Sequence, residues 1–177
     1  SFLKEAMHLS PDYPVVISKF FQNASEVEVD AVSNGKEVII GSIVEHIDNA
    51  GIHSGDAMMC IPPWRLNRQI TDTISEYTRM IAISLKVCGP VNIQYIVKDE
   101  QVYVIEANVR ASRSMPFVSK IVGINIISLA AKAMLGKPMP RNLGKMWLRV
   151  PGFGIKVPQF SFMQLEGADI VLGVEMQ

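Results

Sequence analysis

Two pairs of apolar, alternating segments, each pair joined by a short turn, constrain the fold of this chain most. The first pair is EVEVDAVS (26–33) and KEVIIGSIVEHI (36–47), separated by Asn34-Gly35. Both turn residues tolerate a positive φ, so Asn-Gly between alternating segments is a strong signal for an antiparallel hairpin. A second pair of the same kind follows later in the chain. The two pairs together predict a largely antiparallel sheet.

Other short segments predict further strands around this sheet. PVVISKFF (14–21) is apolar and β-branched, which favours a buried strand. AGIHSGDAMMCIPP (50–63) predicts a loop that runs into a short strand, which the two prolines end. The Pro- and Gly-rich stretch after residue 136 predicts one or two more strands without a usable period.

Two segments have the period of helices that pack one face on a core. Within 67–86, apolar residues recur at steps of three and four: Ile70, Ile74, Tyr77, Ile81 and Leu85. Gly89-Pro90 follows and is expected to stop this helix. NIISLAAKAML (125–135) predicts a second helix with Asn125 as its N-cap and a glycine just past its end. Strands outnumber helices, so the fold class is α+β, with helices packed on the sheet.

Length and composition limit the kind of protein this is. A chain of 177 residues with 49% hydrophobic residues can bury one core, so we expect a single domain over 1–177. A net charge of zero argues against bulk binding of nucleic acid or of an anionic membrane surface. No apolar run reaches the ~18–20 residues of a membrane span, and SFLKEAMHLS lacks the pattern of a secretion signal. Cys60 and Cys88 are expected to be buried, reduced thiols.

The second hairpin, VNIQYIV (91–97) and VYVIEANV (102–109), carries polar side chains at regular intervals. Alternation along a strand predicts one face with Val104, Glu106, Asn108 and Arg110, and a core face with Tyr103, Ile105, Ala107 and Val109. If the connecting loop has three residues, position 94 lies opposite 106 and position 92 lies opposite 108. Gln94, Glu106 and Asn108 would then crowd one patch.

Three oxygen-bearing side chains suit a hard divalent cation such as Mg²⁺ or Mn²⁺, which prefers carboxylate, carbonyl and water oxygens and is usually completed by substrate phosphates. We therefore interpret Gln94, Glu106 and Asn108 as a metal site. The alternative is a solvated outer face of the hairpin. A solvent face more often carries Lys, Thr and Ser than an amide–acid–amide cluster followed by two arginines.

Arg110 and Arg113 follow this patch, where the chain leaves the strand. Guanidinium groups bind phosphate and carboxylate in a forked geometry and stay charged at physiological pH. Beside a metal-bound phosphate they would stabilise the charge on a transferring phosphoryl group. The alternative is that they pair with Glu26 or Asp56 for stability alone.

The segment EHIDNAGIHSGD (45–56) contains glycines together with His46 and His53. Its flanking strands and its glycines predict a loop, so the seven-residue spacing of the histidines does not predict a zinc site. A glycine-containing turn that offers backbone N–H groups, with Ser54 and His53, suits a nucleotide or another anion. An ordinary reverse turn is the alternative.

Several stretches together resemble one known family. They are PVVISKFFQNASEVEVDAV, EHIDNAGIHSGD, GPVNIQYIVKDEQVYVIEANVRASRSMPFVSK and KVPQFSFMQLEGADIVLGVEM. They are similar to the large subunit of carbamoyl-phosphate synthetase, and more narrowly to the C-terminal lobe of an ATP-grasp domain in that subunit. The ending FSFMQLEGADIVLGVEM resembles the second, carbamate-phosphorylating half of the subunit, in its pyrimidine-pathway form.

The resemblance implies roles for individual residues. Gln94, Glu106 and Asn108 would hold the divalent metals, Mg²⁺ or Mn²⁺, that bridge the β and γ phosphates of ATP. Asn108, Arg110 and Arg113 are the implied catalytic residues. The implied contacts to ATP along the rest of the site are Lys19 and Phe21 for the adenine, Glu26 for the ribose hydroxyls, and Gly51, Ile52, His53 and Ser54 for the wall of the site.

The resemblance also implies an ATP-grasp ligase that phosphorylates carbamate to carbamoyl phosphate. Its implied partners are ATP, carbamate, the remainder of the large subunit or multifunctional chain, and a glutaminase subunit or domain, with neither nucleic acid nor membrane. The product serves pyrimidine synthesis, or the arginine pathway. The expected location is the cytoplasm, with a mitochondrion as the alternative.

In this family another ATP-grasp lobe precedes these residues and an allosteric domain follows them. The sequence shows neither, so we expect a partial ATP-grasp domain that is inactive when isolated, because enclosure and orientation supply much of the affinity and rate. Two alternatives stay open. The chain is a non-catalytic interaction module, or it is a lobe of another ATP-grasp ligase such as a biotin carboxylase relative.

Overall fold

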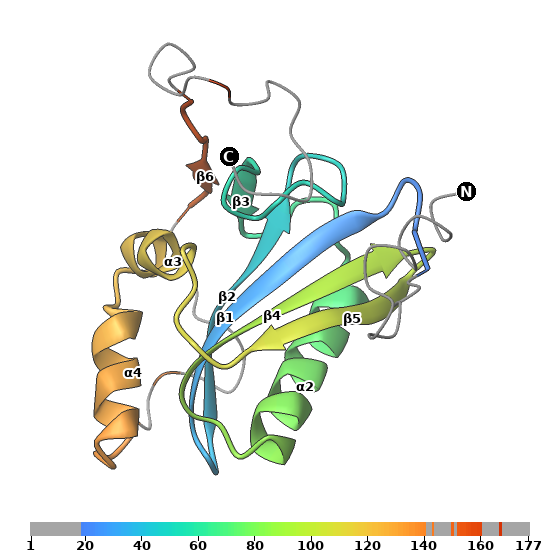
Figure 1. Cartoon of the computed structure of the whole chain (residues 1–177). Helices are drawn as coiled ribbons and strands as arrows, with labels where there is room; N and C mark the ends of the chain where they lie inside the picture. Colours follow the sequence, from blue (N-terminus) through green and yellow to red (C-terminus); the bar gives the residue numbers. More distant parts are fainter. Residues whose placement is uncertain (1–18, 141–142, 144–149, 151, 161–166, 168–177) are drawn as a thin grey trace.

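The computed structural model describes residues 19–140, 143, 150, 152–160 and 167 (Figure 1). Six strands form one sheet in the order β5-β4-β1-β2-β3-β6, with every neighbouring pair antiparallel. The strands are β1 (Ser25–Asn34), β2 (Val38–His46), β3 (Met59–Ile61), β4 (Cys88–Lys98), β5 (Gln101–Asn108) and β6 (Gly154–Lys156). The helices in the described residues are α2 (Arg68–Ser84), α3 (Met115–Val122) and α4 (Ile126–Met134). The predicted α+β class is confirmed.

The helices cover the two faces of the sheet. α2 packs Ile70 and Ile74 against inward-facing residues of β1 such as Val27 and Val29. α3 and α4 pack on the opposite face, where β1 contributes Val32. Figure 1 shows α2 on one side of the sheet and α3 and α4 on the other. The alternate residues of β1, Glu26, Glu28 and Asp30, share the sheet face on which α3 and α4 pack.

The first hairpin forms as predicted, but its turn works differently. β1 pairs with β2 from Val27 opposite Glu45 to Ser33 opposite Val38. Only Gly35 has a positive φ, of 84°. Asn34 contributes its side chain, whose Oδ1 accepts hydrogen bonds from the backbone N–H of Lys36 at 3.0 Å and of Glu37 at 2.8 Å. Asparagine therefore stabilises the turn as a side-chain acceptor.

The buried face of α2 is only partly the one that the apolar spacing predicts. Tyr77 is 36% exposed and Leu85 is 55% exposed. The buried residues of the helix are Ile70, Thr71, Ile74, Ser75, Thr78 and Ala82. The hydroxyls of Ser75 and Thr78 donate to backbone carbonyls one turn earlier, both at 2.8 Å. Small polar residues that bond their own helix can be buried at low cost, and an apolar-spacing argument misses them.

The end of α2 is also different from the expectation. The helix ends at Ser84 with Leu85 as its C-cap, and Lys86 adopts the left-handed conformation with a φ of 51°. Gly89 and Pro90 do not stop the helix, because both belong to β4, where Pro90 pairs with Val32.

β4 and β5 are joined by a two-residue turn, so the expected three-residue loop is wrong. Lys98 pairs with Gln101, which leaves Asp99 and Glu100 between the strands. Both have a positive φ, of 49° and 59°, as in hairpin turns whose twist matches that of the flanking strands. This turn alone would place Gln94 opposite residue 105.

A β-bulge restores the register that the sequence predicts. Tyr95 pairs with Val104 but Gln94 pairs with Glu106, so Ile105 is the extra residue. Beyond the bulge, Asn92 lies opposite Asn108. The predicted pairing of the polar positions is therefore confirmed.

The bulge also changes which side chains of β5 face the site, in the part of the strand that lies between the bulge and the turn. Alternation predicts Val104 on the polar face, but Val104 pairs with Tyr95, whose hydroxyl lies 2.7 Å from that of Thr78 on α2. The same rule predicts Tyr103 and Ile105 in the core. Instead the Tyr103 ring packs on Phe21 and Ile105 lines the cavity described below.

The remaining elements confirm some expectations and correct others. α4 has Asn125 as its N-cap, whose Oδ1 accepts from Ser128 N at 2.8 Å. α3 was not expected from the residue pattern. Lys19–Phe21 lie in no strand, and the other residues of the predicted strand 14–21 lie outside the described ones. The predicted short strand before the two prolines is β3, and β6 is the described part of the wrapping stretch.

Both cysteines are free, but only Cys60 is buried. Cys88 is exposed at the start of β4, and its thiol donates to Ala133 O at 3.3 Å. Within the described residues, no single helix is long and apolar enough to cross a membrane; α3 and α4 meet that test only as a pair, across a bend of 114°.

Replacing Ile74 by Ala is expected to lower the free energy of unfolding by roughly 2–5 kcal/mol, because the substitution leaves a cavity between α2 and the sheet. Ile74 is fully buried, whereas Met80 on the same helix is 57% exposed. Met80→Ala is the matched control and should change the free energy by less than about 0.5 kcal/mol. Urea unfolding measures both, and equal losses would contradict this packing of α2.

Candidate functional site

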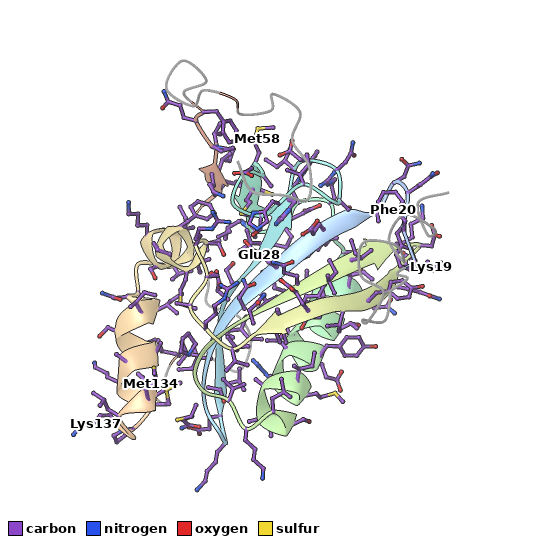
Figure 2. The ribbon with its side chains drawn as sticks, in the orientation of Figure 1. Lys19, Phe20, Glu28, Met58, Met134 and Lys137 are labelled. Atoms are coloured by element: carbon purple, nitrogen blue, oxygen red, sulfur yellow. The ribbon has the colours of Figure 1, made fainter. Side chains whose placement is uncertain are left out.

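A cavity of about 610 Å³ opens on the face of the sheet opposite α2, at the end where β1 begins. Its lining residues are Lys19, Phe20, Phe21, Glu26, Ala50, Gly51, Ile52, His53, Ser54, Gln94, Ile96, Ile105 and Glu106. Figure 2 shows Lys19 and Phe20 at that end of the sheet and Glu28 nearer its middle. The cavity brings together the seven residues with implied contacts to ATP and two of the three implied metal ligands, Gln94 and Glu106. Their roles stay predictions. Asn108, Arg110 and Arg113 are not part of the lining.

The polar end of the cavity is built by β4 and β5. Gln94 and Glu106 face each other across the strands and both line the cavity. Asn108 lies just beyond, where its Nδ2 donates to Glu106 Oε1 at 2.8 Å. Arg110 Nη2 in turn donates to Asn108 Oδ1 at 3.4 Å. The carboxylate, the amide and the first arginine therefore form one connected row.

The residues of this row suit a hard divalent cation by their chemistry. Gln94, Glu106 and Asn108 lie close together on the two strands and carry amide and carboxylate oxygens, and such cations prefer oxygen ligands. Behind them, Glu28 pairs with Gln94 across the strands and is buried, and its Oε1 has no hydrogen-bond partner within the described residues. The donor set and this unpartnered buried oxygen both fit a cation at this end of the cavity.

The other end of the cavity is aromatic and apolar. The rings of Phe21 and Tyr103 lie 4.7 Å apart between centroids, and Lys19 Nζ lies 4.9 Å from the Phe21 centroid. Ile96 and Ile105 continue this wall. Apolar and aromatic walls with a few polar groups are typical of sites for flat organic ligands.

The loop between β2 and β3 closes the cavity and is held by β1. Glu26 Oε2 accepts a hydrogen bond from Gly51 N at 3.1 Å, where Gly51 has a φ of 98° that favours glycine. Gly55 N donates to His53 Nδ1 at 3.0 Å. These two N–H groups are therefore used within the protein, and the binding of a nucleotide or another anion by the rest of this turn stays a prediction.

His53 has a defined tautomer. Its Nδ1 accepts from Gly55 N at 3.0 Å and lies 3.0 Å from Arg113 Nη2, which can only donate. Nδ1 therefore carries no proton, and the proton of the neutral imidazole is on Nε2. His53 lines the cavity as a hydrogen-bond donor, oriented by Arg113 and the backbone.

His46 is not a loop residue, because it ends β2 and is fully buried. Neither ring nitrogen has a hydrogen-bond partner within the described residues, and Nδ1 lies 3.9 Å from Glu26 Oε1. Burial, followed by the nearby charges of Lys156 and His53, lowers the pKa of His46 to about 4. Burial outweighs the carboxylate at 3.9 Å, because that contact is too long for a hydrogen bond.

Comparison with known proteins identifies the family. Residues 2–142 match the family model described as carbamoyl-phosphate synthase L chain, ATP binding domain. The chain belongs to this family. It is 51% identical over 177 residues to the multifunctional protein URA2 of Saccharomyces cerevisiae, covering 99% of this chain and 8% of that protein. It is 46% identical over 186 residues to the C-terminal section of the carbamoyl phosphate synthase large chain of Methanocaldococcus jannaschii, covering 99% of this chain and 30% of that one.

Solved structures show the fold. The biotin carboxylase–β,γ-ATP complex from Campylobacter jejuni superimposes with a TM-score of 0.64 at 21% identity, over 77% of this chain and 30% of that one. The fold is therefore that of the ATP-grasp biotin carboxylase domains. The much higher identity to carbamoyl-phosphate synthases decides against the alternative of a biotin carboxylase relative.

Three charged residues of this carbamoyl-phosphate synthase domain that lie near the candidate site, outside the cavity lining, were missed in the sequence. Glu28 and Asp30 continue the alternation from Glu26, and that period of two is the signal that could have found them. Burial, and then the neighbouring Asp30, raises the pKa of Glu28 to about 7, and burial also raises the pKa of Asp30. Lys156 of β6 donates to the carbonyl oxygens of Ser54 at 3.0 Å and Gly55 at 2.9 Å. No local pattern marks Lys156, because it reaches the loop from more than a hundred residues away.

The lining residues that the sequence missed have separate explanations. Ile96 follows Gln94 by two positions on β4, so alternation could have found it. Ile105 was missed because it is the extra residue of the bulge, and no residue type in the sequence predicts a bulge there. Phe20 and Ala50 lie in loops, where no period applies.

His46 is expected to make the protein less stable in acid. The unfolded chain takes up a proton near the ordinary pKa of 6.5, but the buried imidazole does so only at about 4. The unfolded state therefore binds more protons in this window, and stability is lost as the pH falls through it. His46→Gln should lose less, by roughly 3 kcal/mol across the window of about 2.5 pKa units, since one pKa unit corresponds to about 1.4 kcal/mol.

Urea unfolding of the wild type and His46→Gln at each end of this pH window measures the difference. The comparison between the two proteins is needed because Glu26, Glu28 and Asp30 have raised pKa values. A raised carboxyl pKa lowers the stability of the fold as the pH rises, which opposes the effect of His46. Identical pH profiles would contradict a buried, neutral His46.

Proposed function

We propose that this chain is the nucleotide-binding lobe of a ligase that converts ATP and carbamate to ADP and carbamoyl phosphate. The observation that carries the proposal is the row from Glu106 through Asn108 to Arg110, beside a cavity with an aromatic end, in a member of the carbamoyl-phosphate synthase family. An oxygen of carbamate attacks the γ-phosphorus. The bond from this phosphorus to the bridging oxygen breaks, and the electron pair leaves with ADP.

The chain's own residues bind and orient the nucleotide in this proposal. Phe21 and Lys19 contact the adenine at the aromatic end of the cavity, and Glu26 accepts hydrogen bonds from the ribose hydroxyls. Gly51, Ile52 and Ser54 form the wall, and His53 donates from Nε2. The proposal is supported by the position of all these residues around one cavity.

Charge on the phosphates is met at the polar end. Mg²⁺ or Mn²⁺, when bound, would neutralise part of the charge on the β and γ phosphates, and Gln94, Glu106 and Asn108 are the residues that would hold it. Arg110 and Arg113 bind the acceptor and the transferred group, and their fixed positive charge favours the transition state over the ground state.

The proposal extends to the setting of the reaction. The chain spans 8% and 30% of the two relatives described above, so the rest of the large subunit or of a multifunctional chain is proposed to supply the other ATP-grasp lobe. A glutaminase subunit or domain supplies the nitrogen. The product serves pyrimidine synthesis, or the arginine pathway, in the cytoplasm or in a mitochondrion.

Replacing Glu106 by Gln in the longer protein is expected to lower carbamoyl phosphate synthesis from carbamate and ATP by at least about 100-fold, because the carboxylate of the polar row is lost. Glu76→Gln removes the same charge from an exposed position on α2 and should leave the rate unchanged. Coupled assay of ADP and carbamoyl phosphate measures both. Near-normal turnover in Glu106→Gln would contradict the proposed function.

The chain by itself is proposed to bind nucleotide weakly, as a non-catalytic part of the enzyme. The described lining of the cavity comes from one sheet face and its loops, and a second lobe would supply the enclosure on which affinity depends. Calorimetry of this chain with Mg-ATP is expected to give a Kd weaker than about 1 mM. Micromolar binding would contradict the need for a second lobe, while it would leave the proposed reaction intact.

A further inference from the structure

The segment that carries the two arginines leaves β5 without any regular structure until α3 begins. Arg110 and Arg113 are both exposed, as is Ala111 between them. Exposed loop residues are usually mobile, yet catalytic positioning requires fixed side chains. Two serines flank Arg113, and their contacts show what fixes this segment. They are Ser112 and Ser114.

Both serines are tied to one buried carboxylate on the central strand. Asp30 is fully buried and is not among the residues that line the cavity. Its Oδ1 accepts from Ser112 Oγ at 2.5 Å and from Asn92 Nδ2 at 3.0 Å, and its Oδ2 accepts from Ser114 Oγ at 2.6 Å. One side chain therefore holds the segment by hydrogen bonds to the residue before Arg113 and to the residue after it.

The same contacts begin the helix that follows. Ser112 Oγ accepts from Met115 N at 3.0 Å and lies 2.9 Å from Ser114 Oγ. Ser112 thus satisfies a free N–H group at the start of α3, whereas Ser114, at the N-cap position, makes no side-chain cap. Asp30, the two serines and α3 form one unit that the core holds in place.

The unit sets the position of Arg113 against the loop of the cavity. Arg113 Nη2 lies 3.0 Å from His53 Nδ1, and a Cβ atom built on Gly55 would lie 2.5 Å from Arg113 Cζ and 2.6 Å from Nη1. The guanidinium therefore packs directly against the backbone of Gly55, where a larger side chain would clash with it. It is located from one side by Asp30 and from the other by the loop.

We propose that Asp30 is a positioning residue for phosphoryl transfer, which holds Ser112 and Ser114 so that Arg110 and Arg113 face the transferred group. The inference rests on the proposed function of the arginines. Asp30 itself does not contact the ligand in this proposal and acts through the two serines. The proposal predicts that loss of Asp30 changes the rate of transfer and leaves nucleotide binding in place, because the cavity lining is built by other residues.

Shape identifies the conservative variant. Asp30 accepts hydrogen bonds from Ser112 at 2.5 Å and from Ser114 at 2.6 Å, and the two hydroxyls lie 2.9 Å apart. Asparagine at this position has the same shape and keeps one oxygen that can accept from a serine hydroxyl, whereas its amide group can donate to the other serine oxygen. Asp30→Asn should therefore restore what Asp30→Ala loses.

The kinetic test uses the longer enzyme with Asp30→Ala, Asp30→Asn and Ser42→Ala. Asp30→Ala is expected to lower kcat for carbamoyl phosphate synthesis by about 100-fold with the KM for ATP unchanged, as for a misplaced catalytic group. Asp30→Asn is expected to recover most of the rate. Ser42 is fully buried directly opposite Asp30 on β2, where its hydroxyl donates to its neighbour Ile43 O, so Ser42→Ala should behave as the wild type. A wild-type kcat in folded Asp30→Ala would overturn the proposal.

Gly55→Ala displaces Arg113 from the other side while the hydrogen bonds of Asp30 stay intact. It should reproduce the loss of kcat, and Gly152→Ala, where a Cβ meets no atom within 4 Å, should not. An unchanged kcat in Gly55→Ala would count against Arg113 as the group that Asp30 positions. This variant keeps the test decisive even where Asp30→Ala unfolds.

Amide hydrogen exchange in this chain separates the inference from the proposed function. Asp30→Ala should speed exchange at Met115 N and its neighbours, and should not do so in β2. Slow exchange at Met115 would overturn the role of Asp30 in holding the segment, whatever the reaction. A wild-type enzyme that makes no carbamoyl phosphate, with fast exchange in Asp30→Ala, would instead refute the proposed function alone.

Discussion

One extra residue in β5 is the constraint on which the candidate site depends. Tyr103 and Glu106 are three positions apart, so in a regular strand they would point to opposite faces. The bulge at Ile105 removes this conflict, because a one-residue change of register reverses the faces on one side of it. A single strand can then place the Tyr103 ring, which packs on the lining residue Phe21, on the same face as the carboxylate of Glu106.

The central strand β1 connects the two loops that flank the cavity. Glu26 holds the loop of Gly51, and Asp30 holds the segment of Ser112. Both acids lie on a strand that is paired on both sides, so neither loop moves without disturbing the sheet. Buried carboxylates are costly, and their raised pKa values express that cost. The hydrogen bonds that these carboxylates accept from the two loops offset part of that cost, and they fix both loops to one rigid strand.

The sequence predicts the features that depend on local period and on chain neighbours. Both hairpins and α4 follow from alternation, turn residues and helix caps. The pairing of Gln94 with Glu106 is predicted from a three-residue loop, and it holds because the bulge makes up for a loop that is one residue shorter. The sequence misses features in which distant residues meet or an element is irregular. The bulge at Ile105 and the approach of Lys156 belong to this group, because register and long-range packing are decided by the whole sheet. α3 is short, and its start depends on Ser112 and Asp30 instead of a cap in its own sequence.

Zero net charge leaves local arrangement as the way for this chain to attract a polyanion. Positive groups near the cavity include Lys19, Arg110, Arg113 and Lys156. They stand among several carboxylates, and ionised carboxylates would repel phosphates. Burial moderates this repulsion, since a pKa of about 7 leaves Glu28 partly neutral at physiological pH. Burial therefore lets the acids of β1 organise the loops while it limits the negative charge that they present to an anionic ligand.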